Sequence, residues 1–219
     1  MPISKRQLTR ESKLYQLYLR FVPNSYIELE RALVGCKTLL DVGCGSSSPI
    51  SIFSDRMYTV GVDAFAPSIE RSKADGIHNE YHQMDVMDIG KRFSPRSFDC
   101  VLAFDLIEHL SKEDGVRLLG MMEMIARERV VVFTPSGFLP QGEYESNPWQ
   151  VHRSGWTPEE MRDRGYDVIG VNGWKHLRGE LGAVRYRPAL VWAFISDLTQ
   201  LFVRSRPENA YQMLCVKNL

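Results

Sequence analysis

The sequence predicts an α/β fold in which helices flank a mostly parallel β-sheet. Short runs rich in β-branched residues alternate with segments of helical periodicity, as in doubly wound sheets. The first of these runs leads directly into a glycine turn, and the chain ends in a strand, a helix and a further strand. With 219 residues, 44% of them hydrophobic and 25% charged, the chain can bury one sizeable core, so we expect a single domain over residues 1–219.

The predicted elements follow in chain order. Residues 1–36 should form an N-terminal helical cap, with a helix from Lys5 to Val34. Helical periodicity over 112–127 predicts a helix that covers one face of the sheet, and the apolar stretch 188–204 predicts a mostly buried helix. We expect the last strand to return antiparallel at the sheet edge. The predicted strands are Thr38–Val42, Tyr58–Val62, Tyr81–Met84, Phe98–Phe104, Arg129–Phe133, Asp167–Val171 and Tyr211–Val216.

Three further segments divide the predicted domain. Residues 37–134 hold the expected cofactor-binding core, and residues 158–219 hold the C-terminal part of the sheet. Between them, residues 135–157 contain three prolines, three glycines and two tryptophans without clear periodicity. Connections of this length are usually functional loops, so we expect a substrate loop; a long surface connection is the alternative.

Composition limits the partners and the compartment. Twenty-seven basic residues balance 27 acidic ones, which weighs against a nucleic-acid acceptor without excluding it. The four cysteines show no CxxC spacing, and we expect them in the core of a cytoplasmic protein. No signal peptide or transmembrane segment is predicted. The helix over 188–204 has one apolar face followed by two arginines, so peripheral membrane contact stays open; covering the sheet is the alternative.

The glycine turn is the most informative local pattern. An apolar strand runs through Asp41 into Gly43 and Gly45, where the lack of a Cβ allows a ligand to approach the backbone. A helix should begin among Ser46–Ser48, which are good N-capping residues. Asp63 ends the second strand about twenty residues further on, and its carboxylate can accept hydrogen bonds from both hydroxyls of a ribose. This pattern predicts a cofactor that contains a nucleoside.

Two cofactor classes fit this arrangement. Nicotinamide dinucleotides favour a third glycine where this chain has Ser48. S-adenosylmethionine needs an acid near the turn for its ammonium group, and Asp41 meets that need directly or through water. The pattern therefore favours S-adenosylmethionine over NAD(P).

Four segments together resemble the class I S-adenosylmethionine-dependent methyltransferases. Asp41–Gly45 is similar to the first motif of that family, and Gly61–Asp63 to its ribose-binding acid. Met84–Val86 is similar to the segment that flanks adenine, and Phe98–Leu110 to the fourth-strand segment of the ubiquinone- and menaquinone-biosynthesis subgroup. One departure is Ser46–Ser48, where the family has a further glycine. The cofactor-binding residues implied are Asp41, Gly43, Cys44, Gly45, Asp63, Ala64, Asp85, Val86, Phe104 and Asp105.

The resemblance also implies a seven-stranded sheet with the last strand antiparallel, and S-adenosylmethionine as cofactor. The activity that it implies is methyl transfer to an oxygen or carbon of a small-molecule, glycan or lipid-like acceptor. A non-catalytic binding protein of the same fold and an NAD(P)-dependent oxidoreductase are the alternatives. The sequence does not predict the oligomeric state.

Two histidines are candidate catalytic bases for a hydroxyl acceptor. His109 follows Glu108 just beyond the fourth strand, although both residues could simply shape the next helix. His152 lies in the predicted substrate loop, where it could instead be a hydrogen-bonding strut. Trp149 and Trp156 could line the acceptor pocket or anchor the loop. No metal site is predicted, because the remaining histidines lack metal-ligand spacing. N-terminal aromatic residues could cap the acceptor site or pack on the sheet: Tyr15, Tyr18, Phe21 and Tyr26.

Overall fold

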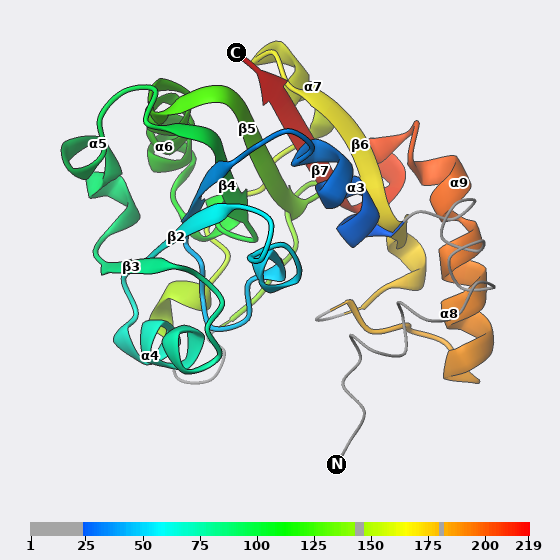
Figure 1. The fold of residues 1–219 in the computed structure, drawn as a ribbon. Coiled ribbons are helices and arrows are strands. Elements are labelled where there is room, and N and C mark those ends of the chain that lie inside the picture. Colours follow the sequence, from blue (N-terminus) through cyan, green and yellow to red (C-terminus); the bar gives the residue numbers. More distant parts are fainter. Residues whose placement is uncertain (1–23, 143–146, 180–181) are drawn as a thin grey trace.

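The computed structural model describes residues 24–142, 147–179 and 182–219. Its centre is one seven-stranded sheet in the order β3-β2-β1-β4-β5-β7-β6 (Figure 1). Strands β1 to β5 run parallel to one another, and β7 pairs antiparallel with both β5 and β6. The strands are β1 (Thr38–Val42), β2 (Tyr58–Asp63), β3 (Glu80–Gln83), β4 (Phe98–Phe104), β5 (Ala126–Pro135), β6 (Asp167–Trp174) and β7 (Ala210–Asn218).

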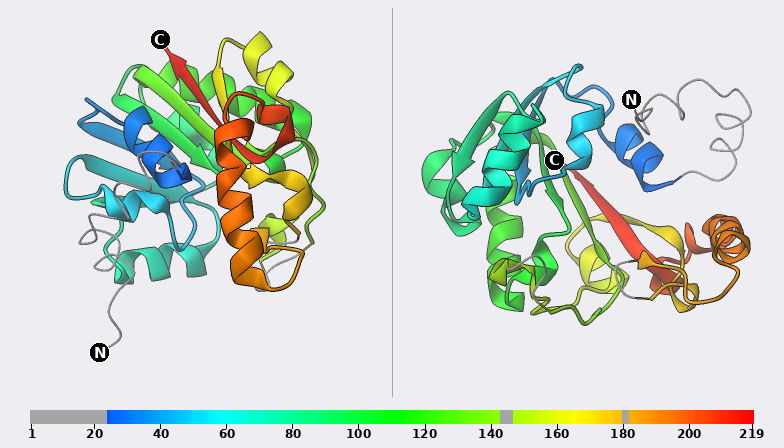
Figure 2. Two further views of the ribbon diagram at one scale, coloured as in Figure 1. Left: turned by 90° about the vertical axis from the view of Figure 1, so that its right-hand side faces the viewer. Right: turned by 90° about the horizontal axis from the view of Figure 1, so that it is seen from below.

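Helices lie on both faces of this sheet (Figure 2). The described α-helices are α3 (Ser25–Ala32), α4 (Ala66–Ala74), α5 (Ile89–Arg92), α6 (Lys112–Ile125), α7 (Pro158–Asp163), α8 (Ala189–Leu198) and α9 (Gln200–Val203). Short 3-10 helices span Pro49–Ile52, Val86–Asp88, Ile107–His109, Pro148–Gln150, Lys175–Leu177 and Pro207–Asn209.

Two apolar clusters form the core, one on each face of the sheet. Because successive strand residues point to opposite faces, Leu40 of β1 joins the cluster under α6, whereas Leu39 joins the cluster under α3. The central strands are buried on both faces, which explains their continuous apolar runs. All four cysteines are buried and free, as the sequence analysis expected.

The predicted fold class is confirmed, with four differences in detail. The antiparallel strand β7 lies between β5 and β6, so the edge strand is β6 and the expectation of β7 at the edge was wrong. The segment after the glycine turn forms the 3-10 helix Pro49–Ile52 instead of an α-helix; Ser48 caps it by accepting a hydrogen bond from the Ile50 N–H. The segment 188–204, expected as one mostly buried helix, forms α8 and α9 with largely exposed apolar side chains, so that expectation was wrong. Of the helix expected over Lys5–Val34, residues 1–23 lie outside the described part, and α3 lies within the rest.

The parallel strands all end at the same edge of the sheet. The glycine turn follows β1 there, Asp63 ends β2, and Asp105 follows β4. In open α/β sheets, ligands bind outside the carboxyl ends of the strands. This edge is therefore where the functional groups are to be sought.

Candidate active site

A cavity of about 490 Å³ opens at the glycine turn. Tyr26 of α3 and Arg71 of α4 form part of its wall, and Gln150 reaches it from the loop after β5. Six of the ten predicted cofactor-binding residues line it: Asp41, Gly43, Cys44, Gly45, Phe104 and Asp105.

The backbone of the turn explains its two glycines. Gly43 and Gly45 have φ angles of 69° and 56°, in the left-handed region that side chains disfavour. The N–H groups of Gly43 and Cys44 donate to the Val62 carbonyl of β2, at 2.8 and 2.9 Å. A Cβ on Gly43 would meet Leu106, whereas the side-chain direction of Gly45 is open. The turn is thus tied to β2 on one side and left accessible on the other.

Asp63 holds the turn from the end of β2. One carboxylate oxygen accepts from the Gly45 N–H and the other from the Phe65 N–H, both at 2.8 Å. Burial raises the pKa of this carboxyl, and these backbone donors oppose that shift. Asp63 does not itself line the cavity, so its predicted ribose contact remains a prediction.

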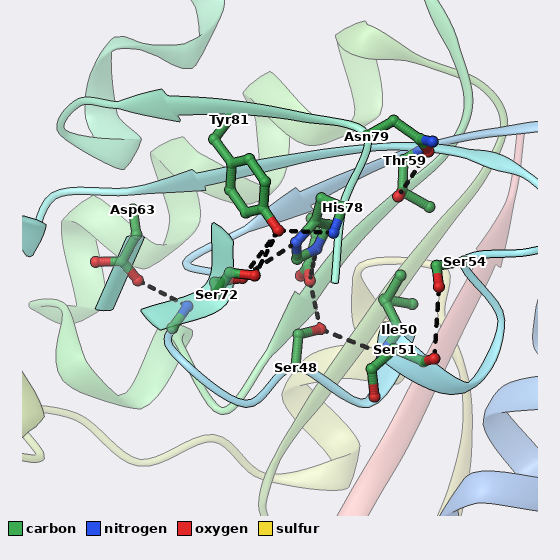
Figure 3. A network of polar contacts seen from close by, with 12 residues as sticks. Ser48, Ile50, Ser51, Ser54, Thr59, Asp63, Ser72, His78, Asn79 and Tyr81 are labelled. Atoms are coloured by element: carbon green, nitrogen blue, oxygen red, sulfur yellow. Dashed lines mark hydrogen bonds and ion pairs between the residues drawn. The ribbon is translucent and has the colours of Figure 1, made fainter. Parts of the chain in front are cut away.

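A buried polar network surrounds Asp41, and Figure 3 shows its members Ser48, Ser72, His78 and Tyr81. Asp41 Oδ2 accepts from Ser48 Oγ at 2.5 Å and lies 2.9 Å from His78 Nε2. The other side of His78 approaches Ser72 Oγ at 3.5 Å, and its backbone N–H donates to Tyr81 Oη. The Oδ1 atom of Asp41 is buried without a hydrogen-bond partner. Sequence analysis assigned His78 no role, because nothing in the sequence pairs residues 41 and 78.

Besides Asp63, three predicted cofactor residues are absent from the cavity lining in the described structure. Asp85 is exposed and its side chain caps the Val86–Asp88 helix by accepting from the Met87 N–H. The Val86 side chain is buried in the core cluster under α6. Ala64 follows Asp63 beside the cavity without lining it. Their predicted cofactor contacts therefore stay predictions.

A second cavity, of about 680 Å³, adjoins the first. Five residues line both cavities and so mark the boundary between them: Tyr26, Ser47, Phe104, Asp105 and Gln150. The second cavity continues over both predicted catalytic histidines and reaches β6 and β7. Two adjoining cavities at one sheet edge suit a reaction between a cofactor and an acceptor.

Glu108, His109 and His152 meet in this second cavity. One ligand atom from each residue lies within 4.8 Å of the other two. The imidazole rings of His109 and His152 pack edge to face, with centroids 4.7 Å apart. Thr134 Oγ1 donates to Glu108 Oε2 at 2.8 Å, whereas Glu108 Oε1 is buried without a partner. The structure thus brings together two predicted catalytic residues and adds Glu108.

Backbone hydrogen bonds bring His152 to this cluster. The N–H groups of Arg153 and Ser154 both donate to the Glu108 carbonyl, at 2.8 and 3.0 Å. Trp156 is fully buried, and its Nε1 donates to the Ile107 carbonyl at 3.3 Å. Trp156 therefore anchors the loop, whereas Trp149 is exposed, and neither lines the cavities.

Burial governs the electrostatics of the cluster. It raises the pKa of Asp105 to about 7, even though Gln212 donates a hydrogen bond to that carboxylate. Burial and the nearby Asp105 raise the pKa of Glu108 well above its usual range. Burial, then repulsion from His152, lowers the pKa of His109 to about 4, and burial lowers that of His152. Both imidazoles are therefore neutral at pH 7.

Neutral imidazoles and a carboxylate are ligands for divalent transition metals. His152 Nδ1 lies 2.5 Å from the Leu139 carbonyl, a contact that fixes Nδ1 as the donor and leaves the lone pair on Nε2. A cation would also supply a partner for Glu108 Oε1. No metal site was predicted from the sequence, and Glu108 and His152 are too far apart in the chain to form a recognisable motif.

A known protein family matches the part of the chain that forms the carboxyl edge of the sheet. The model of a family described as a methyltransferase domain matches residues 40–133. This segment is a methyltransferase domain. It contains the glycine turn, Asp63, Asp85 and the Glu108–His109 pair. The predicted resemblance to class I methyltransferases is thus confirmed, whereas the ubiquinone- and menaquinone-biosynthesis subgroup stays a prediction.

Solved structures share the fold of the methyltransferase domain and its flanking elements. A SAM-dependent methyltransferase from Archaeoglobus fulgidus has a TM-score of 0.56 at 17% identity, covering 94% of this chain and 99% of that one. The methyltransferase domain of the bacterial CtHen1-CN has a TM-score of 0.55 at 20% identity, covering 89% and 97%.

One curated relative is considerably longer than this chain. It is a small RNA 2′-O-methyltransferase from Tetrahymena thermophila, 24% identical over an alignment that covers 68% of this chain. The chain spans only 44% of that relative's length.

Proposed function

We propose that this chain binds S-adenosylmethionine in the cavity at the glycine turn and transfers its methyl group to a hydroxyl oxygen. The observation that carries the proposal is that this cavity adjoins a second one lined by Glu108, His109 and His152. Methyl transfer is an in-line displacement, so holding cofactor and acceptor on either side of one boundary supplies most of the catalysis.

The residues of the first cavity fit the cofactor. Asp41 has a buried oxygen without a partner, which an ammonium group can satisfy directly or through water. Gly45 leaves open space at the turn for an amino-acid tail. Asp63 keeps lone pairs for ribose hydroxyls, and Asp85 remains exposed for the adenine amine. When bound, the cofactor supplies the activated methyl group.

The cluster in the second cavity supports a hydroxyl acceptor, because a hydroxyl must lose its proton during transfer. Two arrangements can remove that proton. Without a bound cation, His152 can take it on Nε2. We favour the other arrangement, a divalent cation held by Glu108, His109 and His152, which would bind the hydroxyl and lower its pKa so that the proton passes to solvent. The cation would also offset the repulsion between the neighbouring Asp105 and Glu108 carboxylates, which otherwise raises the pKa of Glu108.

Calorimetry with S-adenosylhomocysteine and transfer of labelled methyl groups to a panel of hydroxyl compounds test the proposal. We expect micromolar binding, transfer that is lost with a chelator, and recovery with Mn²⁺ or Zn²⁺. Glu108→Gln should bind S-adenosylhomocysteine normally and lose transfer. If transfer persists in the presence of a chelator but is lost without His152, then His152 is the base. Failure of the protein to bind S-adenosylhomocysteine would refute the proposal.

A ribose 2′-hydroxyl of RNA is a second candidate acceptor. The observation that favours it is the curated relative, whose name gives that activity. Short RNAs with a 3′-terminal 2′-hydroxyl and their 2′-deoxy counterparts belong in the acceptor panel. Transfer to the RNAs that carry the 2′-hydroxyl, and not to their 2′-deoxy counterparts, would support this acceptor.

A further inference from the structure

Helices α8 and α9 present an apolar stripe to solvent. They follow β6, lie at the right-hand edge of the molecule in Figure 1 and face the viewer in the left view of Figure 2. At 100° per residue, the exposed apolar side chains fall within one third of the helix circumference. The apolar stripe, with exposed fractions, consists of Leu190 (87%), Val191 (53%), Phe194 (56%), Leu198 (45%), Leu201 (58%) and Phe202 (48%).

The buried side of the same helices includes two polar side chains. Gln200 Nε2 donates to the Gly170 carbonyl at 2.8 Å, and Gln200 Oε1 accepts from the Gly173 N–H at 3.1 Å. Ser196 is fully buried and its Oγ accepts from Arg178 Nε at 3.0 Å. A surface helix normally turns its apolar face to the core. Here specific hydrogen bonds to β6 and to Arg178 hold the apolar stripe outward.

The close packing of α8 and α9 on β6 depends on two glycines of that strand. A Cβ on Gly173 would lie 2.5 Å from the Ser196 carbonyl oxygen, and one on Gly170 would lie 2.1 Å from the Val203 carbonyl oxygen. The helix backbone therefore rests directly on the strand. Rotation of the apolar stripe inward would break the bonds of Gln200 and Ser196 and leave both polar groups without partners.

Cationic and aromatic residues flank the stripe. Arg185 and Arg187 are exposed before α8, and the exposed Arg206 after α9 stacks on Phe202 at 4.4 Å from its ring centroid. Tyr186 packs on Trp192 at the start of α8, with ring centroids 4.8 Å apart. Within α8 and α9 the charged residue is Asp197, which pairs with Arg178.

We propose that the apolar stripe of α8 and α9 docks on an anionic lipid surface. The stripe would enter the interface between headgroups and acyl chains, and the flanking arginines would meet the lipid phosphates. Aromatic residues such as Tyr186 and Trp192 are enriched at that depth. In the described part of the chain no helix has the length and hydropathy to cross a bilayer, so the contact is peripheral.

Docking would bring the acceptor cavity to the lipid surface. Arg178 lines that cavity and also bonds Ser196 of α8 through Nε. Resting on the proposed function, this link adds hydroxyl compounds carried on or in a membrane to the acceptor panel.

Vesicle sedimentation tests the docking. The full chain is mixed with phosphatidylcholine vesicles, with or without 30% phosphatidylglycerol as a chosen probe composition, at two salt concentrations. We expect sedimentation with anionic vesicles, weakened by salt. Phe194→Ser/Leu201→Ser should reduce the bound fraction at least about 10-fold. The matched control, Val34→Ser/Met124→Ser, replaces exposed apolar residues elsewhere and should bind like the parent chain.

Arg185→Gln/Arg187→Gln should lose the preference for anionic vesicles while keeping weak binding. The proposal is overturned if the parent chain does not sediment, or if Phe194→Ser/Leu201→Ser sediments as well as the parent. Light scattering that shows a dimer broken by the same variant would assign the stripe to a second copy instead. Vesicle binding is measured without cofactor. If the chain fails to bind vesicles but still binds S-adenosylhomocysteine, docking alone is overturned. If it binds vesicles but not S-adenosylhomocysteine, the proposed function alone is overturned.

Discussion

Asp41 Oδ2 lies 2.9 Å from His78 Nε2, a contact between two buried residues 37 positions apart. His78→Ala should remove it and leave Asp41 with Ser48 as its one side-chain partner. We expect the free energy of unfolding to fall by about 1–3 kcal/mol and S-adenosylhomocysteine affinity to fall with it. Urea denaturation and calorimetry measure the two effects. His82→Ala, which removes a partly exposed histidine 2.7 Å from Glu80 on the edge strand β3, should cost less than His78→Ala.

The two glycines of the turn should respond differently to alanine. Both need a positive φ, so each substitution should cost about 1 kcal/mol or more. At Gly43 the new Cβ would also lie 2.6 Å from Leu106 Cδ1, so Gly43→Ala should destabilise the protein further. Gly45→Ala, whose Cβ faces open space, should chiefly weaken cofactor binding. Equal losses of stability in both variants would contradict this distinction.

Asp63 should matter more for the cofactor than Asp85. Asp63→Ala removes the acceptor of the Gly45 and Phe65 N–H groups as well as the predicted ribose contact, so we expect S-adenosylhomocysteine affinity to fall by about 10- to 100-fold. Asp85→Ala changes an exposed side chain and should weaken binding less. Unchanged affinity in Asp63→Ala, measured by calorimetry on a variant with a normal melting transition, would remove Asp63 from the cofactor site.

Displacing the loop that carries His152 should impair the acceptor site and leave the cofactor site intact. A Cβ on Gly115 of α6 would lie 2.5 Å from Cζ2 of the buried Trp156. Gly115→Ala should therefore displace the loop that carries His152, lowering methyl transfer at least about 10-fold while S-adenosylhomocysteine still binds. Gly120→Ala in the same helix, where the new Cβ meets nothing, is the control. Loss of cofactor binding in Gly115→Ala alone would contradict a role confined to the loop.

The loss of folding stability in acid should depend in part on Asp99. Although burial acts to raise its pKa, hydrogen bonds from the Lys37 and Thr38 N–H groups and the charge of Arg127 hold that pKa below its usual range. The stability contributed by Asp99 is therefore complete above its unfolded pKa of about 3.9 and is lost as the pH falls through the folded pKa. Asp99→Asn should unfold more readily in urea at pH 7, by about 1–3 kcal/mol. The difference from the parent chain should shrink below pH 4.

Local sequence patterns predicted most of the fold because each depends on neighbouring residues. Apolar runs marked β1 and β4, and Gly43 with Gly45 marked the turn between β1 and the next helix. The position of β7 between β5 and β6 was not predicted, since strand pairing depends on contacts between distant segments. For the same reason sequence analysis found His109 and His152 separately. It could not predict that Glu108 joins them or that His78 holds Asp41.

The hydrogen bonds that seat His152 come from main-chain N–H groups of Arg153 and Ser154, which donate to a main-chain carbonyl. Such bonds survive most changes of side chain. Laboratory evolution could therefore exchange Leu139, which lines the second cavity on the same loop, without moving the histidine, whereas the Gln141 side chain donates to the Gln150 carbonyl and helps to hold the loop. Acceptor preference and the chemical step would then be separable engineering targets, with a library at Leu139 altering the first while the second is retained.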